Sequence, residues 1–256
     1  MDQRIGAQGY TIRDFIKTPE DLETSLKKLK DIGYQAIQLS GMGPIDPQVV
    51  RDLLEKYNME AICTHRAPEE YLNHLNETIA LHQIIGCRIA GLGSMPGDYE
   101  RTAAGVRQFV KDFTPVYEAF KKEGMTFAYH NHAFEFLKDE GKFLMDILLE
   151  ESDFDFIVDT YWIAYAGVDP ASYIRKTGSR AKVVHFKDLK CVLDGTHKCN
   201  AAITEVMEGN LDWDSIIAAC EEAGVQAAMV EQDICPGDPF DSLRISYHNL
   251  KTKGFC

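Results

Sequence analysis

Short apolar runs of β-type composition alternate with longer helical segments along the whole chain. Eight runs are predicted as strands, at residues 4–9, 36–40, 60–65, 88–92, 126–130, 156–160, 182–187 and 227–232. Several of them are apolar throughout, such as FIVD, KVVHF and AAMVE. Continuous apolar runs are typical of parallel strands that are buried on both faces of a sheet.

The segments between these runs carry apolar residues at helical spacing. Residues 19–32 place four aliphatic side chains near one helical face, and Gly33 follows as a stop. Trp213 is expected to pack where a later helix begins, with Asp212 as its cap. Further helices are predicted from residue 47 and at residues 69–85, 99–122, 143–149, 170–176, 212–223 and 239–252.

The alternation of strands and helices indicates βαβ units and a parallel sheet. Such a sheet either closes into a (β/α)₈ barrel or stays open and doubly wound. No glycine-rich G-x-G-x-x-G loop follows a strand, which counts against a dinucleotide-binding open sheet. The length of 256 residues matches one barrel of about 250 residues. We therefore predict a single (β/α)₈ TIM barrel domain over residues 1–256, because no linker or low-complexity segment interrupts the pattern.

The net charge of the chain indicates which classes of molecule it can bind. The chain has 40 acidic and 27 basic residues, a formal net charge of −13. A surface this acidic repels nucleic-acid phosphates and anionic membranes. We expect a small-molecule carbohydrate as partner, no nucleic acid and no membrane. The oligomeric state stays open, and a homo-oligomer is one of the alternatives.

The cysteine content and the lack of export signals indicate a cytoplasmic protein. Seven cysteines, an odd number without regular spacing, fit reduced thiols better than a disulfide framework. Cys191, His197 and Cys199 lack an evident fourth ligand, so no zinc site is expected there and their segment is predicted as a loop. Neither a signal peptide nor a run of about 20 apolar residues is present in the sequence.

Polar side chains follow five of the predicted strands at the point where each strand ends. They are His65 and Arg66 after the third strand, His130, Asn131 and His132 after the fifth, Asp159 after the sixth, His185, Lys187 and Asp188 after the seventh, and Glu231, Gln232 and Asp233 after the eighth. In a barrel the carboxyl ends of all strands meet at one rim, where active sites are built. Charged groups are rarely buried unless they are paired or bind a metal. The sequence therefore predicts an active site at this rim.

Four of these residues have the chemistry of metal ligands. Asp159, His185 and Glu231 end the last three strands, which are neighbours in a barrel, and His130 ends the strand before them. Divalent cations bind carboxylate oxygens and imidazole nitrogens. We predict that the four residues hold one divalent metal ion, Mn²⁺, Co²⁺, Mg²⁺ or Zn²⁺, and leave coordination positions open for substrate.

Simpler interpretations of single residues stay open at this point. Asp159 can be a helix cap or turn residue, since aspartate favours such places. Lys187 and Asp188 can form an exposed ion pair of little energetic weight. His65 is expected to contact substrate rather than metal.

Aromatic residues in the predicted loops suggest a sugar-binding pocket. Tyr10, Tyr161 and Trp162 would lie over the rim and stack against the apolar C–H face of a sugar, although Trp162 can equally pack in the core. With His65 and Asp233, Tyr10 and Trp162 form the predicted substrate-binding set. No anion-binding loop is visible, so a phosphate group on the substrate is not supported.

The segment VDTYWIAYAGVDPASYIRKTGSRAKVVHFKD resembles the xylose isomerase-like TIM barrel superfamily, the sugar phosphate isomerase/epimerase family. The shared pattern is Asp-Thr-x-Trp, Ala-Gly-x-Asp-Pro, then an arginine and a valine-rich strand that ends His-x-Lys-Asp. IGAQGYTIRDF and VEQD also match, so the resemblance covers nearly the whole chain. It implies a metal held by one ligand from each of strands five to eight, usually Glu, Asp, His and Glu.

The resemblance assigns Asp159, His185 and Glu231 to the last three ligand positions. The first position departs from the family pattern, because family members with a glutamate read Leu-Glu-Asn-His where this chain reads Tyr-His-Asn-His. His130 then takes the glutamate position, unless Glu135 reaches in instead.

The histidine at the first ligand position affects which reaction the resemblance implies. In the epimerases of the family two metal-bound glutamates act as opposed bases, and a histidine at one position breaks that symmetry. The His-x-His run, together with Glu-Gln-Asp after the last strand, is similar to inosose dehydratase, a metal-dependent lyase of the same superfamily.

These features predict a divalent-metal-dependent isomerase or epimerase that removes a proton next to the carbonyl of a small sugar or keto-sugar. Its predicted catalytic residues are Glu231, His132, Lys187 and Glu135. The alternative is a lyase of the inosose dehydratase type, which eliminates water or an aglycone after the same first step. An apurinic-site endonuclease of this superfamily would need a basic DNA-facing surface, and a non-catalytic binding protein would not need polar ligands at four successive strand ends.

Overall fold

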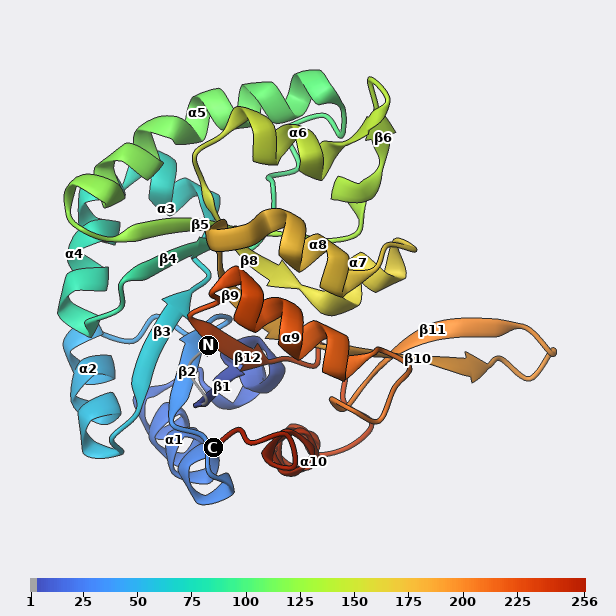
Figure 1. Ribbon diagram of the computed structural model, residues 1–256. Helices are drawn as coiled ribbons and strands as arrows, with labels where there is room; N and C mark the ends of the chain where they lie inside the picture. Colours follow the sequence, from blue (N-terminus) through green and yellow to red (C-terminus); the bar gives the residue numbers. More distant parts are fainter. Residues whose placement is uncertain (1–3) are drawn as a thin grey trace.

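The predicted apolar runs form a closed barrel in the computed structural model, which describes residues 4–256. Eight parallel strands follow one another around the barrel in the order β1-β12-β9-β8-β5-β4-β3-β2 (Figure 1). Their bounds are Ile5–Gln8 (β1), Ala36–Leu39 (β2), Glu60–Thr64 (β3), Ile89–Leu92 (β4), Thr126–His130 (β5), Asp155–Asp159 (β8), Ala181–Phe186 (β9) and Ala227–Val230 (β12). The pairs of β1 with β2 and with β12 close the ring. The predicted (β/α)₈ TIM barrel is therefore confirmed.

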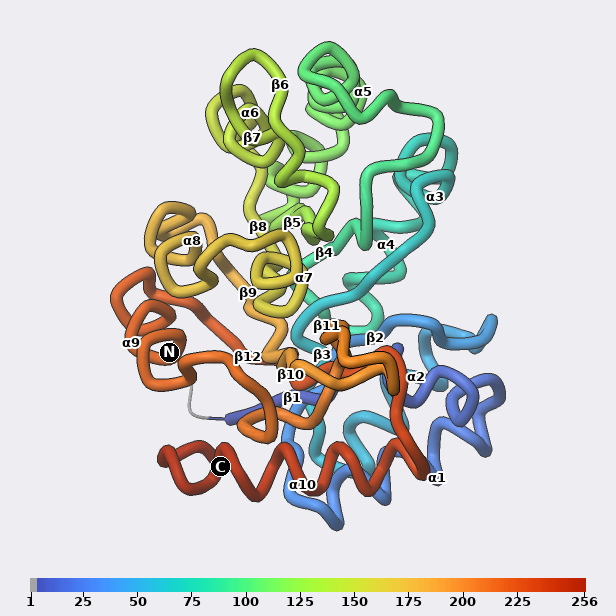
Figure 2. The backbone as a smooth tube through the Cα atoms, turned by 90° about the vertical axis from the view of Figure 1, so that its right-hand side faces the viewer, coloured from blue at the N-terminus to red at the C-terminus, as the bar shows by residue number. Residues whose placement is uncertain are grey.

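Helices surround the strands, as the turned view in Figure 2 shows. They are α1 (Pro19–Ile32), α2 (Pro47–Lys56), α3 (Pro68–Asn73), α4 (Leu75–Ile85), α5 (Ala103–Lys122), α6 (Leu144–Glu151), α8 (Pro170–Thr177), α9 (Trp213–Ala223) and α10 (Pro239–Lys251). The helix predicted at residues 69–85 is broken at His74, whose φ of −134° is not helical. The helix predicted at 99–122 begins only at Ala103, because the Thr102 hydroxyl caps it by accepting from Gly105 N at 3.1 Å.

The interior of the barrel is filled by small and medium-sized apolar side chains. They are Ala36, Cys63, Ile89, Ala128, Ile157, Val183, Ala227 and Met229. Gly6 on β1 makes room for Met229, since a Cβ on Gly6 would lie 2.2 Å from the Met229 sulfur. A second and larger cluster of apolar side chains lies between the strands and the helices, and it includes the aromatic rings of Phe109, Phe127 and Phe154. The barrel is thus packed inside and outside, as the continuous apolar strands require.

Several elements go beyond the eight repeats. They are the short helices η1 (Gly9–Phe15), η2 (Phe134–Phe136), α7 (Thr160–Tyr165) and η3 (Gly178–Arg180), the strand pair β6 (Lys138–Asp139) and β7 (Lys142–Phe143), and the hairpin of β10 (Asp188–Leu193) with β11 (Cys199–Thr204). The hairpin extends away from the barrel in Figure 1. The prediction of a loop around Cys191 and Cys199 is therefore wrong, because these residues lie in paired antiparallel strands.

The hairpin is anchored to the barrel by a buried carboxylate. Asp188 accepts hydrogen bonds from Met207 N at 2.8 Å, Gly209 N at 3.1 Å and Trp213 Nε1 at 2.7 Å. Both Asp188 and its neighbour Lys187 are buried, so the interpretation of these two residues as an exposed ion pair is wrong. The predicted cap of α9 is confirmed, since Asp212 accepts from Ser215 N at 3.1 Å.

None of the helices in the described residues 4–256 is both long enough and apolar enough to cross a bilayer.

His82 is a fully buried histidine that links α4 to the end of β3. Its Nδ1 donates to the Thr78 carbonyl oxygen at 2.7 Å, and its Nε2 pairs with the Thr64 hydroxyl at 2.9 Å. Burial lowers the pKa of His82 to about 4, against an ordinary value of 6.5. Its stabilising contribution is therefore complete above pH 6.5 and is lost as the pH falls toward 4.

We expect the free energy of unfolding to fall with acidification partly through His82. Between pH 7 and pH 5 the parent should lose about 2 kcal/mol more than a His82→Leu variant, because only the parent must protonate this imidazole on unfolding. Urea unfolding at several pH values measures the difference. His248→Gln, a change at an exposed histidine of α10, is the control and should follow the parent. Parallel pH profiles for His82→Leu and the parent would contradict the assignment.

Candidate metal centre

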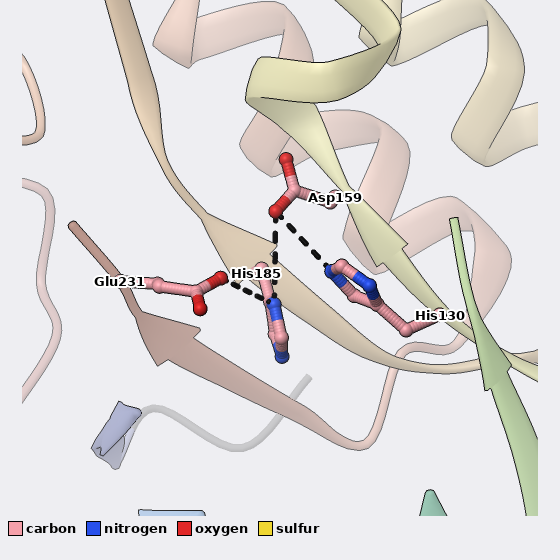
Figure 3. A group of neighbouring side chains, drawn as sticks. All are labelled: His130, Asp159, His185 and Glu231. Carbon is pink, nitrogen blue, oxygen red and sulfur yellow. Dashed lines mark hydrogen bonds and ion pairs between the residues drawn. The ribbon is translucent and has the colours of Figure 1, made fainter. Parts of the chain in front are cut away.

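Four side chains converge at the carboxyl ends of four adjacent strands (Figure 3). They are His130 at the end of β5, Asp159 at the end of β8, His185 on β9 and Glu231 directly after β12. Each offers one ligand atom, and these atoms lie within 4.8 Å of one another. All four residues are buried. The structure thus brings together the four residues that the sequence predicted as metal ligands.

Hydrogen bonds outside the cluster fix the orientation of both imidazoles. The His130 Nδ1 lies 2.9 Å from the carbonyl oxygen of Gly93 and the His185 Nε2 lies 2.8 Å from the Gln38 Oε1. Both partners are oxygens that can only accept, so the two ring nitrogens carry the hydrogens. The remaining nitrogens, His130 Nε2 and His185 Nδ1, therefore present lone pairs to the cluster. Such outer hydrogen bonds are characteristic of histidines that bind metals.

Asp159 serves two purposes with its two oxygens. Its Oδ1 accepts from Trp162 N at 2.9 Å and so caps α7. Its Oδ2 faces the cluster, 3.4 Å from His130 Nε2 and 3.7 Å from His185 Nδ1. The helix-cap interpretation and the ligand interpretation of Asp159 are thus compatible.

The donor set fits a divalent cation. With metal–ligand bonds of about 2.0–2.2 Å, neighbouring ligand atoms are separated by roughly 3 Å. Three of the distances here, 2.8, 3.4 and 3.7 Å, are close to that, and all four ligand atoms lie within 4.8 Å of one another. His185 Nδ1 lies only 2.8 Å from Glu231 Oε2, and both side chains are buried. A lone pair and a carboxylate oxygen this close repel each other unless a positive charge lies between them. Two imidazole nitrogens and two carboxylate oxygens suit Mn²⁺, Co²⁺ or Zn²⁺.

The balance of positive and negative charges in the site also favours a bound cation. The Lys187 Nζ lies 2.8 Å from Asp233, 3.3 Å from Glu231 and 3.4 Å from Asp159. One ammonium therefore faces three carboxylates, which leaves a deficit of two positive charges when the imidazoles are neutral. Burial raises the pKa values of Asp159 and Glu231, but the Lys187 charge and the histidines outweigh it and hold both pKa values well below the ordinary range.

Without a cation, a proton takes its place on His185. Burial lowers the pKa of this imidazole, but the carboxylates of Glu231 and Asp159 outweigh burial and raise it to about 9. Binding of a metal would therefore displace this proton.

His65 and His132 stand beside the cluster rather than in it. The His65 ring lies 5.1 Å from that of His130, and the His132 ring lies 5.2 Å from that of Trp162. Burial is the main cause that lowers the pKa of His132 to about 3 and the pKa of His65 well below its ordinary value. Both imidazoles are therefore neutral at physiological pH. His65 Nε2 and His132 Nδ1 have no hydrogen-bond partner in residues 4–256.

The cluster lies at one side of a pocket of about 500 Å³. All four predicted substrate-binding residues line it, namely His65, Trp162, Tyr10 and Asp233, as do the predicted catalytic residues Glu231, His132 and Lys187. Tyr161 is placed differently from the expectation. It is buried and stacks on Tyr165, with ring centroids 5.7 Å apart, so it supports α7 instead of facing a sugar.

Glu135 does not join the cluster. Its Oε1 accepts from the Tyr129 hydroxyl at 2.6 Å and its Oε2 accepts from His132 N at 2.8 Å. Burial raises its pKa to about 7. Both oxygens are thus engaged in holding the turn after β5, and the structure brings His130, not Glu135, to the fourth ligand position. Glu135 thus supports this turn, and its expected catalytic role stays a prediction.

Sequence reasoning missed four polar residues of the site: Gln8, Gln38, Ser40 and Arg13. Gln8, Ser40 and Arg13 line the pocket, and Gln38 holds His185. Gln8 ends β1 and Gln38 is the residue before the end of β2, close to where the predicted ligands lie on the later strands. The rule of polar residues at strand ends could have found both, but their uncharged amides drew less attention than carboxylates and imidazoles.

Comparison with known proteins agrees with this architecture. Residues 26–239 match the model of the xylose isomerase-like TIM barrel family. The chain belongs to this family. The resemblance stated from the sequence is therefore confirmed.

Individual relatives in the family are distant. The inosose dehydratase of Clostridium perfringens (strain 13 / Type A) is 22% identical, with 86% of this chain and 85% of the relative covered. That of Lacticaseibacillus casei is 21% identical, with 93% and 92% covered. A sugar phosphate isomerase/epimerase from Parabacteroides distasonis superposes with a TM-score of 0.81 at 22% identity, covering 98% of this chain and 99% of the other. An L-ribulose 3-epimerase gives 0.73 at 16% identity, covering 99% and 97%. These structural likenesses show the fold.

Metal analysis tests the cluster. Protein dialysed against Mn²⁺ or Zn²⁺ should retain close to one divalent ion per chain, and Asp159→Ala and His185→Ala should lose it, because each removes a ligand atom. Mass spectrometry of metal content, with circular dichroism as a check on folding, gives the answer. His248→Ala, at an exposed histidine, is the matched control. Retention of the ion in both ligand variants would show that the assignment is wrong.

Gln38→Leu should weaken metal affinity although Gln38 is not a ligand. Loss of the bond to His185 Nε2 frees the imidazole to rotate and to change tautomer, and changes of such outer partners weaken metal binding by about 10- to 100-fold. Competition with a chromophoric chelator measures the affinity. Unchanged affinity would mean that the Gln38–His185 bond does not orient a ligand.

Proposed function

We propose that this protein is a divalent-metal-dependent isomerase or epimerase that removes a proton next to the carbonyl of a small sugar or keto-sugar. The observation that carries the proposal is the oriented set of four ligand atoms beside a pocket of polar and aromatic side chains. Membership of the xylose isomerase-like family supports it.

His130, Asp159, His185 and Glu231 would hold the cation, which supplies Lewis-acid polarisation of a carbonyl oxygen and so acidifies the neighbouring C–H bond. The protein's own groups then handle the proton and the charge. Lys187 is kept protonated by its three carboxylates, since these outweigh burial and raise its pKa above the ordinary value. Its ammonium would balance negative charge that develops on a substrate oxygen.

Two proton acceptors come from different strands of the pocket wall. Glu231 follows β12 and is ionised, while His132 follows β5 and is neutral with a free Nδ1. In the barrel, β8 and β9 lie between these strands. A proton taken by one group and returned by the other would arrive on the opposite face of the carbon, as epimerisation requires. A carboxylate and an imidazole would thus replace a pair of carboxylates.

Dehydration is the second candidate function, and two observations favour it. Glu135 is tied to Tyr129 and to the His132 backbone, so it does not supply a second base opposite Glu231. The inosose dehydratases are similar over most of both chains. Elimination needs the same removal of a proton but only one base, because the adjacent hydroxyl group leaves with a proton as water.

Incubation in heavy water tests the proposal and separates the two outcomes. Metal-loaded protein is mixed with ketoses and keto-inositols and the products are analysed by mass spectrometry and NMR. Uptake of one deuterium with otherwise unchanged mass is expected for isomerisation or epimerisation, and loss of water for the dehydratase. Exchange that continues at the same rate after chelation of the metal would refute the proposal.

His132→Gln separates catalysis from metal binding. This residue is outside the four-ligand cluster, so the variant should keep its metal while the exchange rate falls by about 10²–10⁴-fold, the usual contribution of a general base. A His132→Gln variant with full metal content and full activity would remove His132 from the mechanism. Tyr165→Phe, at an exposed aromatic residue of α7, is the control and should keep both.

A further inference from the structure

The polar groups of the pocket divide into cations that already have partners and neutral nitrogen-bearing side chains with an atom that has none. The pocket contains two cationic side chains, Lys187 and Arg13. It also contains four side chains with a buried, unpartnered nitrogen, which are Gln8, His65, His132 and Trp162. This division bears on the charge of the substrate.

Lys187 is already paired with three carboxylates before any substrate binds. Its side chain is 1% exposed and its Nζ lies within 3.4 Å of carboxylate oxygens of Asp159, Glu231 and Asp233. A phosphate or carboxylate brought to this ammonium would also meet those three carboxylates. With a divalent cation bound, the three carboxylates, the ammonium and the cation sum to zero, so no excess positive charge remains here to hold a phosphate or carboxylate.

Arg13 is held at the edge of the pocket by backbone and ring contacts. Its Nη1 donates to the carbonyl oxygens of Tyr10 at 2.9 Å and of Asp233 at 3.1 Å. Its guanidinium carbon lies 4.4 Å from the centre of the Tyr10 ring. The group thus braces η1 against the turn after β12. Both Nη1 hydrogens are thus used, so an anion would bind through Nη2 and Nε alone or would have to break one of these bonds.

The neutral donors, in contrast, lack partners. Gln8 is fully buried, and its Oε1 accepts from Tyr10 N at 2.9 Å, which leaves Nε2 as the free end of the amide. Trp162 Nε1 is buried as well and can only donate. Of seven such orphaned side-chain atoms in residues 4–256, four belong to residues that line this one pocket. A buried polar group without a partner is unfavourable, so a ligand that supplies the missing oxygens gains affinity.

We infer that the substrate is an uncharged polyhydroxylated compound, not a sugar phosphate, and that Gln8 and Trp162 bind its oxygens. The inference rests on the proposed function, whose substrate class it narrows. Amide and indole N–H groups are neutral donors that match hydroxyl and carbonyl oxygens. Phosphate sites use free arginines, lysines or clustered backbone N–H groups instead.

Matched polyols with and without a phosphate test the inference. D-glucitol with D-glucitol 6-phosphate and myo-inositol with myo-inositol 1-phosphate are suitable pairs, because all four lack a carbonyl and cannot react. Isothermal titration calorimetry with the metal-loaded protein should give a dissociation constant at least about tenfold lower for each neutral member. Because this is an equilibrium measurement without turnover, its outcome is independent of the heavy-water experiment.

Two variants locate the contacts. Gln8→Met and Trp162→Phe should each weaken binding of the neutral polyol by about tenfold, the effect of one lost hydrogen bond to a buried donor. Metal content shows that the cation site is intact, and Trp162→Phe stands as the test if Gln8→Met fails to fold. Gln83→Met, on α4 outside the pocket, is the control and should bind like the parent.

Tighter binding of the phosphorylated polyols, abolished by Arg13→Gln, would overturn the inference and show Arg13 as an anion site. Parental affinity in both Gln8→Met and Trp162→Phe would overturn it too, as would failure of both neutral polyols to bind. In each of these cases the four-ligand metal cluster and the proton-exchange chemistry would remain as separate questions with their own measurements.

Discussion

The structure depends on holding an imidazole nitrogen and a carboxylate oxygen in contact, with a proton or a metal ion between them. His185 Nδ1 and Glu231 Oε2 are 2.8 Å apart, and neither can turn away, because Gln38 fixes the far side of the imidazole and Lys187 fixes the carboxylate. In a buried position, where water screens little, such an arrangement is unfavourable without a positive charge between the atoms. The barrel supplies the rigidity that maintains it, since each ligand follows or ends a strand paired on both sides.

The surroundings of the centre show how single residues combine structure and chemistry. Asp159 caps α7 with one oxygen and faces the cluster with the other. Helix capping thus fixes the direction of a ligand at no separate cost in ordering a side chain. Glu135 illustrates the opposite case, a carboxylate near the centre whose two oxygens are both used by Tyr129 and the His132 backbone. The presence of a carboxylate in the right segment therefore does not establish that it can reach the site.

Much of this could be predicted from the sequence, because parallel strands are buried and their ends share one rim. The eight strands, the barrel and the group of His130, Asp159, His185 and Glu231 follow from apolar runs that end in charged residues. The choice between His130 and Glu135 could not be made, since it depends on where a three-residue turn directs a side chain. The hairpin of β10 and β11 was missed because its strands pair only with each other outside the barrel, so they do not follow the alternation of strand and helix on which the prediction relied. Gln8 and Gln38 were missed because amides at strand ends carry no charge that demands a partner.

Met229 determines from which side of the barrel a substrate can reach the metal ligands. It occupies the space left by the missing side chain of Gly6, two residues before Glu231 on the same side of β12, and with its apolar neighbours it fills the barrel below the metal ligands. The barrel interior therefore offers no passage to the metal ligands. Substrate and every product must reach and leave them from the rim where the strands end.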